Sequence, residues 1–430
     1  GENGLECPDN WNVESAELLR EAAAFGQVPA KTSLIEENTV PSWLWNRVSA
    51  SAQTAPESST QQILDRVVGS AAAKAWKEEL FADESSARAF YEDARYMLAQ
   101  RFVGIERRLL SGLGVEWAYG AKTQRNDTIV APAQIPIEIH NKVIDGIVSG
   151  SLDKNIRCVW SKAVGTRAES TATNIRFADT ISEWATAESR PMNAAFDLLS
   201  FRHNDGSVNC DALRHAVRLT MLLLDLHGIQ PALGFQNLAP LLMALAIPYD
   251  SEAARAMAAS ISALITAEAT MISAELSGLR GIHPAFAEQR DVVMRSLRNH
   301  RRAAYGETND YERVSVLPVS LTLESCPDLA LAAAARNQWD DALQLAQHFG
   351  LRHVGMTTLT PASELAFFME SVTQGMEPMR SLTVTQMEGD TQTNALHPSM
   401  TEAMTRLEYD TDATRALTKH VLGTHSLDHA

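Results

Sequence analysis

The stretch from Asp211 to Gly306 limits what this chain can fold into more than any other. Apolar residues recur at helical spacing in DALRHAVRLTMLLLDLHGI, and at least four helical runs follow one another with short joints. The longest run, SEAARAMAASISALITAEATMISAELSGL, follows Asp250, and glycine at 281 is typical of a helix end. Its many small side chains let neighbouring helices approach closely, so we expect a buried central helix in a mostly α fold.

The rest of the chain divides around this block by composition and period. We expect an N-terminal arm with a tryptophan anchor, a helical region, a stretch of mixed period, the central helical block and a C-terminal helical region. Their bounds are 1–50, 51–120, 121–205, 206–306 and 307–430. At 430 residues, the chain is long enough to bury a full core.

Several further elements are expected from period and capping residues. Gln61–Leu80 and Glu84–Phe102 have helical spacing, and Asp83 stands where an N-cap belongs. IEIHNKVIDGIV (Ile137–Val148) predicts an amphipathic helix, whereas IRCVW and TNIRFADTI are the strongest strand candidates. Additional helices are expected at 327–349, 399–408 and 411–422.

Composition excludes some classes of partner. The formal charge of −16 argues against nucleic acid, because affinity for a phosphate backbone comes largely from Lys and Arg. No apolar run approaches the roughly 20 residues that span a bilayer, which leaves peripheral membrane contact open. The four cysteines stand singly without a CxxC pair, so no zinc site or dithiol motif is visible. Such isolated thiols indicate a reducing compartment.

Two small groups of residues are candidates for an interaction surface. Trp43 and Trp45 flank Leu44 in VPSWLWNRV, a pattern that usually packs a tail onto a core and less often stacks on a ligand. Arg301 and Arg302 belong to a basic run, which is typical of a solvated or ion-paired helix face. We therefore name these four residues as a possible interaction surface.

Many segments, in consistent order, resemble one enzyme family. They include VPSWLWNRV, FADESSARAFYEDARYMLAQRFV, LLSFRHNDGSVNCDALRHAVRL, LRNHRRAAYG and SCPDLALAAAARNQWDDALQLAQHFGLRHV. These segments resemble the vitamin B12-dependent (class II) ribonucleotide reductases of the alphaproteobacterial type. The resemblance covers most of the chain, and it implies descent from an α/β barrel enzyme that reduces ribonucleotides through a cysteine thiyl radical.

The residues that carry this chemistry in the family are replaced or absent. The N-P-C-[SG]-E segment with the radical cysteine should lie between IRFADTISEW and DLLSF, and it is missing. Met192 stands where a redox cysteine is expected, and Glu106, Arg107 and Arg108 stand in a substrate-proximal segment that is neutral in the family. The section that should carry most barrel strands is much shorter, so a ten-stranded barrel cannot close.

The phosphate-binding loop of the family, A-P-T-G-T, is also altered. Its place is taken by Thr360, Pro361, Ala362, Ser363 and Glu364. Free backbone N–H groups at a helix start bind phosphate, but a fixed carboxylate repels a diphosphate. As a plain helix start the segment is ordinary, because an acidic residue in the first turn favours the helix dipole. We interpret it as a degenerate phosphate loop.

No other chemistry has a motif behind it. The basic, triple-glycine run expected on the cobalamin side is MRSLTVTQMEGDTQTN here, so we predict no cofactor. No HExxH, GxSxG, Walker or GxGxxG spacing occurs, and a lone histidine is more often a capping or core residue than a catalyst. We therefore predict no catalytic and no metal residue. The histidines weighed for such roles are His283, His300, His353, His397 and His425.

These inferences lead to one expected fold and two alternative functions. We expect a mostly α protein, a helical remnant of the reductase barrel with few strands. Losing the strands would expose apolar helix faces, which favours an inactive relative that acts as a structural or interaction subunit, with other subunits or a second copy as partners. The alternative is a nucleotide- or cobalamin-binding regulatory relative of an intact reductase. A mitochondrial matrix or a bacterial cytoplasmic location would suit either.

Overall fold

The computed structural model describes residues 6–8, 11–12, 15–16, 35–52, 57–115, 137–140, 175–178, 192–314, 317, 323–353, 355–388 and 391–427. Helices dominate these residues, and the strands within them form small separate sheets with no closed barrel. The prediction of a mostly α remnant of the reductase barrel is confirmed.

The described α-helices are α2 (Ser42–Ala52), α3 (Thr60–Lys77), α4 (Glu84–Ala99), α5 (Arg107–Gly112), α11 (Cys210–Leu226), α12 (Leu238–Ala244), α13 (Glu252–Arg280), α14 (Pro284–Ala304), α15 (Leu329–Phe349), α16 (Ser363–Phe368), α17 (Pro398–Arg406) and α18 (Thr411–Thr424). Short 3-10 turns lie at Glu37–Thr39, Leu198–Ser200 and Leu323–Ser325. The strands are β1 (Val103–Ile105), β2 (Ile137–His140), β3 (Ile175–Ala178), β4 (Ala194–Asp197), β5 (Leu233–Gln236), β6 (Thr383–Glu388) and β7 (Thr391–Leu396).

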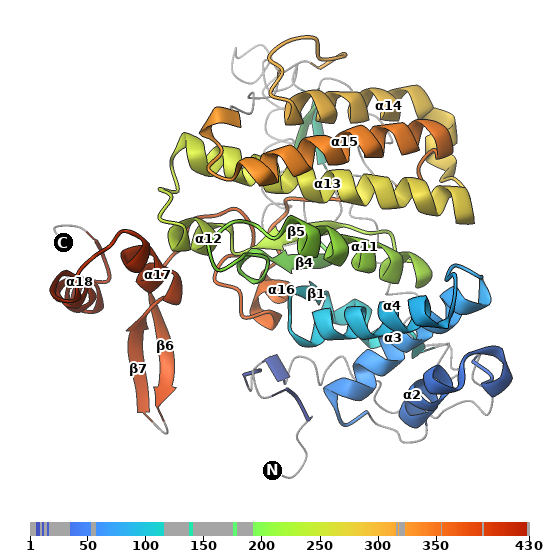
Figure 1. The fold of residues 1–430 in the computed structure, drawn as a ribbon, viewed down its shortest axis with the longest axis horizontal. Helices are drawn as coiled ribbons and strands as arrows, with labels where there is room; N and C mark the ends of the chain where they lie inside the picture. Colours follow the sequence, from blue (N-terminus) through green and yellow to red (C-terminus); the bar gives the residue numbers. More distant parts are fainter. Residues whose placement is uncertain are drawn as a thin grey trace, which may run out of the picture.

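The central helix of the fold is α13, as expected. Its N-cap is Ser251, whose hydroxyl accepts the Ala254 N–H at 3.1 Å, and it ends at Gly281 with φ 95°. It packs against α11, α14 and α15 (Figure 1). Among the described helices, α13 alone is long and apolar enough to cross a membrane. Because 67% of that apolar stretch is buried inside the protein, α13 is better described as a core helix.

The helices near the N-terminus also follow the predictions. The N-cap of α4 is Asp83, whose carboxylate accepts the Ser86 N–H at 2.7 Å. The pair α3 and α4 packs together and against α11. In Figure 1 these two helices lie on the opposite side of the short central strands from α13, α14 and α15. The five-region division of the chain remains a prediction.

A small buried sheet lies between these helical layers. Its order is β1–β4–β5, with β1 antiparallel and β5 parallel to the central strand β4. Thr357 extends the sheet by a parallel bridge to Leu233. This sheet positions the candidate site, because Met192 lies two residues before β4, α5 follows β1, and the altered phosphate loop follows Thr357.

The structure corrects the prediction for residues 137–148. Ile137–His140 form β2, which pairs in parallel with β3. The expected helix is wrong for these four residues, and 141–148 lie outside the described residues. The physical reason is that IEIH alternates apolar and polar residues, so it fits the period of a strand as well as that of a helix. The strand predicted within TNIRFADTI is confirmed by β3, whereas IRCVW lies outside the described residues.

The hairpin formed by residues 383–388 and 391–396 was not predicted from the sequence. The polar run after Ser381 forms the antiparallel hairpin β6–β7, with Thr383 opposite Leu396. The three consecutive β-branched residues Thr383–Thr385 favour a strand, although the run is too polar to signal burial. The hairpin lies with α17 and α18 at one end of the molecule, where α17 packs on α12 (Figure 1).

Candidate functional site

The altered phosphate loop continues the edge of the central sheet. The Thr358 N–H donates to the Leu233 carbonyl at 2.8 Å, and the hydroxyls of Thr358 and Thr360 lie 2.9 Å apart. Ala362 is the N-cap of α16 and has no side-chain hydrogen bond to offer. Its carbonyl accepts from the Gln236 amide at 3.4 Å. The hydroxyl of Thr360 in the altered loop therefore has a hydrogen-bond partner within the chain.

Two residues that depart from the family meet at this loop. Arg107 opens α5, and Glu364 lies in the first turn of α16. The Arg107 Nε donates to the Glu364 Oε1 at 2.8 Å, although the two residues lie 257 positions apart in the chain. A carboxylate of the chain itself thus neutralises a guanidinium beside the altered loop.

Met192, at the position expected for a redox cysteine, is buried in the core. It is 4% exposed and lies two residues before the first residue of β4. Its thioether end lies against Gly234 of β5, where a Cβ would have no room beside Met192 and would also lie 3.0 Å from the Thr358 carbonyl oxygen. A thioether cannot form a disulfide or carry a thiyl radical, so this position supplies no thiol chemistry.

The cysteines that the structure describes are all unpaired thiols. They are Cys7, Cys210 and Cys326, and Cys158 lies outside the described residues. Burial, with help from the nearby Asp328 carboxylate, raises the pKa of Cys210 to about 11. Because the thiolate is the reactive form, Cys210 is a poor nucleophile at neutral pH.

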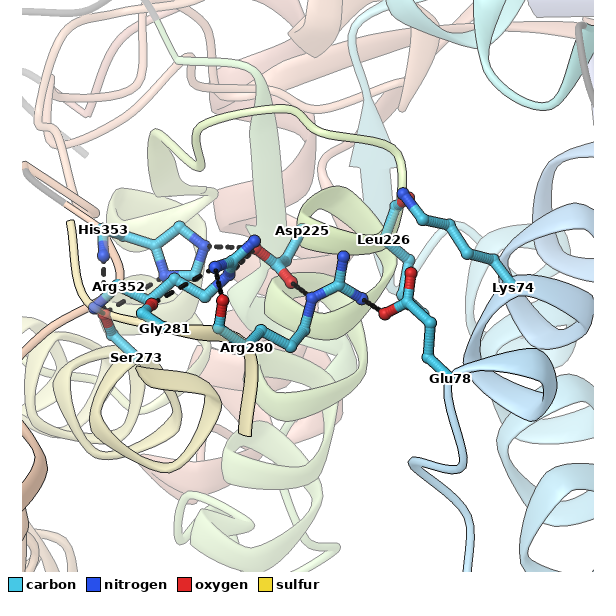
Figure 2. Close-up of polar contacts among 9 residues, drawn as sticks. All are labelled: Lys74, Glu78, Asp225, Leu226, Ser273, Arg280, Gly281, Arg352 and His353. Atoms are coloured by element: carbon cyan, nitrogen blue, oxygen red, sulfur yellow. Dashed lines mark hydrogen bonds and ion pairs between the residues drawn. The ribbon is translucent and has the colours of Figure 1, made fainter. Parts of the chain in front are cut away.

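A buried network of polar side chains joins three helices (Figure 2). Asp225, near the end of α11, is 5% exposed, and its Oδ1 accepts from Arg352 Nε at 2.6 Å and from His353 Nε2 at 3.0 Å. Its Oδ2 lies 3.1 Å from the Nε of Arg280 at the end of α13. One carboxylate is thus shared by three basic side chains.

Ser273 of α13 completes this network in an arrangement that resembles a hydrolytic triad. Its hydroxyl lies 3.1 Å from His353 Nδ1, while the other ring nitrogen faces Asp225. The same hydroxyl also accepts the backbone N–H groups of Arg352 and His353. Ser273 is fully buried and His353 is 1% exposed, so no substrate reaches the hydroxyl. The arrangement is a structural link.

Ionisation of Asp225 is favoured by its partners. Burial by itself would raise the pKa of this carboxyl, but the hydrogen bonds from His353 and Arg352 outweigh it, and the pKa is held below its usual range. The network also reaches the N-terminal layer, since Arg280 pairs with Glu78 at 2.6 Å. Lys74 of α3 donates to the Leu226 carbonyl at 2.7 Å. Figure 2 shows these contacts joining α3 to α11 and α13.

Of the residues in this network, the sequence indicates only His353 as a candidate. Asp225 and Arg352 are 127 positions apart, and neither belongs to a short motif. The remaining candidate histidines serve local roles: His283 and His397 accept a backbone N–H as N-caps, His300 stacks on Trp339 at 5.3 Å, and His425 ends α18. Within the described ranges, no group of three or more His, Cys, Asp or Glu could hold a metal ion.

The two tryptophans proposed for an interaction surface pack on the core. Trp43 lies edge-on to Tyr91, with ring centroids 5.4 Å apart, and the guanidinium of Arg88 lies over its ring. Trp45 is partly buried against the same core. This packing matches the anchor interpretation of VPSWLWNRV.

The two arginines proposed for that surface pair within the chain. Arg301 contacts Asp340 at 2.5 Å, and Arg302 contacts Glu312 at 2.8 Å. Both arginines remain partly exposed. A contact of these four residues with another protein stays a prediction.

Two family models match this chain. Residues 230–429 match the model described as "Ribonucleotide reductase, barrel domain", which includes β5, α13 and the altered phosphate loop. The chain is therefore a ribonucleotide reductase relative in its C-terminal half. Residues 2–101 match "Class II vitamin B12-dependent ribonucleotide reductase". Taken together, the two matches show that the chain is similar to class II, vitamin B12-dependent ribonucleotide reductases in both its N-terminal and its C-terminal parts.

Individual relatives agree with this assignment. The chain is 30% identical over 276 residues to the vitamin B12-dependent ribonucleotide reductase of Agrobacterium fabrum, a match that covers 60% of this chain and 22% of that protein. It is 38% identical over 146 residues to the enzyme of the same name from Bradyrhizobium diazoefficiens, covering 34% of this chain and 12% of that protein. The matched part of each relative is thus a small fraction of its length. These relatives are bacterial and lend no support to a mitochondrial location.

The Arg107–Glu364 pair yields a first prediction. A double-mutant cycle with Arg107→Gln and Glu364→Gln should give a coupling free energy of about 0.2–1 kcal/mol, because the side chains are 23% and 39% exposed and water screens them. The free energies of unfolding from urea titrations of the four proteins would measure it. The control pair is Arg415 with Asp412, which is far more exposed, at 73% and 90%. A coupling no larger than that of the control would contradict the pairing.

Proposed function

We propose that this chain is a catalytically inactive member of the reductase family that serves as a structural or interaction subunit of a larger protein assembly. The observation that carries the proposal is the ion pair between Arg107 and Glu364. In the family, the segments that hold these residues face the substrate and its diphosphate. Here a carboxylate lies at the start of the phosphate-loop helix, where it would repel a diphosphate.

The sulfur-containing side chains of Met192 and Cys210 support the same proposal. Met192 fills the position expected for a redox cysteine and is buried against Gly234. Cys210 is held as a thiol by its surroundings. A radical enzyme of this type needs a reactive thiol beside its substrate, and neither sulfur position meets that need.

Exposed apolar side chains support a role in assembly. Large apolar residues are exposed along the short segment that contains α16, from 359 to 376: Leu359, Phe367, Val372 and Met376 are between 39% and 55% exposed. Contiguous exposed apolar surface on a protein often marks a contact with another protein. This segment is continuous with the altered phosphate loop, so a face that bound substrate in the ancestor would now bind a partner.

Three measurements on the purified full chain test the proposal. Incubation with ribonucleotides, adenosylcobalamin and a dithiol reductant should yield no deoxyribonucleotide, and turnover would overturn the claim of inactivity. Neither adenosylcobalamin nor nucleotides should raise the melting temperature. A rise in that temperature would favour the alternative, a regulatory relative that binds a nucleotide or cobalamin. Sedimentation of the native protein should show an assembly larger than one chain, and a stable monomer would contradict the subunit role.

A further inference from the structure

A short part of the N-terminal region 1–50 makes a set of specific contacts that the similarity to reductases does not explain. This part is residues 11–16, of which 11, 12, 15 and 16 are described, and it is called the arm from here on. The indole N–H of Trp11 donates to the Ala99 carbonyl at 2.9 Å. Its ring lies edge-on to Phe368, with centroids 5.5 Å apart, and 5.2 Å from the guanidinium carbon of Arg101.

The residues after Trp11 bind one carboxylate. The Asn12 N–H and the Ser15 hydroxyl each donate to Glu370 Oε1 at 3.0 Å. The Asn12 side chain accepts the Ser15 N–H at 2.7 Å, which starts a helical turn. Ser15 is fully buried. A carboxylate that receives a backbone N–H and a hydroxyl from the same short segment recognises the backbone shape of that segment as well as its side chains.

The receiving surface is built from two helix ends. Arg101 follows α4 and Glu370 follows α16, and both have left-handed backbones, with φ 58° and 57°. Glycine is the usual residue at such positions because it adopts this conformation without strain. At each end the next residue closes the turn, as Phe102 N–H donates to Met97 and Ser371 N–H to Ala366. The two strained residues form an ion pair with each other.

From this geometry we propose a peptide-docking site formed by Ala99, Arg101, Phe368 and Glu370, called here the arm site. Its ligand is the arm of the same chain, a tryptophan followed by the start of a helical turn of the form Asn-x-x-Ser. The bound arm ties the end of α4 to the end of α16. The proposal does not depend on whether the chain is inactive, because no residue of the arm site belongs to the altered phosphate loop.

Binding of the arm as a separate peptide tests the proposal directly. The probe is a fluorescein-labelled peptide of residues 6–16, added to the full native chain and to the full Trp11→Ala chain, with anisotropy as the readout. The tethered native arm has an effective concentration on the order of mM, so it should exclude the peptide. The Trp11→Ala chain should bind it at least about tenfold more tightly than the native chain does. A peptide that carries Trp11→Ala should not bind.

Substitutions in the arm site test whether Glu370 binds the arm peptide or only forms an ion pair with Arg101. In the Trp11→Ala background, Glu370→Gln should weaken peptide binding about tenfold, because a charged acceptor of two hydrogen bonds becomes neutral. The double reversal Arg101→Glu with Glu370→Arg keeps opposite charges but removes the acceptor from position 370, so it should abolish binding. The matched control is Glu408→Gln, because Glu408 has the same left-handed backbone, with φ 58°, and follows α17. It should leave binding unchanged.

Two results would overturn the proposal. One is equal binding of the peptide to the native and Trp11→Ala chains, and the other is binding that Glu370→Gln and the double reversal leave intact. If the Trp11→Ala chain does not fold, hydrogen exchange in an otherwise native chain decides. The amides of Asn12 and Ser15 should then exchange about tenfold faster in the Glu370→Gln chain than in the Glu408→Gln chain. Equal exchange in the two variants would refute the arm site.

Discussion

Replacement of Asp225 by asparagine is expected to lower the free energy of unfolding by about 3–5 kcal/mol, because removing one partner of a buried ion pair leaves the other charges uncompensated. The carboxylate is 5% exposed and contacts Arg280, Arg352 and His353. The amide keeps the volume of the side chain but loses its charge. Urea unfolding of the two proteins at pH 7 would measure the difference.

A matched control for Asp225→Asn is Asp250→Asn. Asp250 also pairs with an arginine, Arg255, at 2.8 Å, but its side chain is 94% exposed. Pairs of this kind contribute about 0–1 kcal/mol. If Asp225→Asn lowers the free energy of unfolding no more than Asp250→Asn does, the network in Figure 2 does not hold the helices together.

The same carboxylate predicts a pH dependence with a definite sign. The pKa of Asp225 is lower in the folded protein than in the unfolded chain, where the pKa of an aspartate is about 3.9. The folded state therefore gains stability from Asp225 above that value and loses it as the pH falls through the folded-state pKa. The difference in free energy of unfolding between the native protein and Asp225→Asn should be largest at pH 7 and should shrink as the pH falls below about 4. A difference that does not change over this range would contradict the assignment.

Replacement of Arg66 by methionine is expected to cost about 3–5 kcal/mol as well, for the same reason. Arg66 is fully buried within α3, and its guanidinium binds the Glu57 carboxylate at 2.6 and 3.1 Å. It also donates to the carbonyls of Leu110 and Leu113, which lie in and just after α5. Methionine fills much of the space but leaves a buried carboxylate and carbonyl groups without this donor. Thermal and urea unfolding would measure the loss.

Two comparison proteins sharpen the Arg66 prediction. Arg88→Met removes an arginine that is 54% exposed and pairs with Glu84 on the same helix face, so its cost should stay below about 1 kcal/mol. Adding Glu57→Gln to Arg66→Met removes the stranded charge and should recover part of the loss. If the double variant is no more stable than Arg66→Met, the cost comes from packing and not from the buried charge.

Local patterns in the sequence predicted the helices well. Asp83 and Ser251 begin their helices through hydrogen bonds to the backbone three residues on, and Gly281 ends α13. Such signals act within one turn of chain, so they need no knowledge of the fold. The short strands were harder, because β1, β4 and β5 have three or four residues each and pair with segments far away in sequence.

The buried network and the arm site show the same limit for the candidate sites. His353 and Trp11 are ordinary residues in sequence, with no motif around them. Asp225 accepts a hydrogen bond from Arg352, which lies 127 positions away in the sequence. The Asn12 N–H donates to Glu370, which lies 358 positions away. A period or a cap describes neighbours along the chain, whereas these partners become neighbours only after the helices have packed.

Capping, period and residue identity are local properties, so the sequence alone predicts most of the described helices and the loss of reactive groups from recognisable positions. It showed that Met192 stands where a thiol is expected and that Glu364 lies at the start of the altered phosphate loop. The pairing of Glu364 with Arg107 and the packing of Met192 against Gly234 exist only in the folded structure. Those pairings depend on how β1, β5 and α16 approach in space, and no short stretch of sequence encodes that approach.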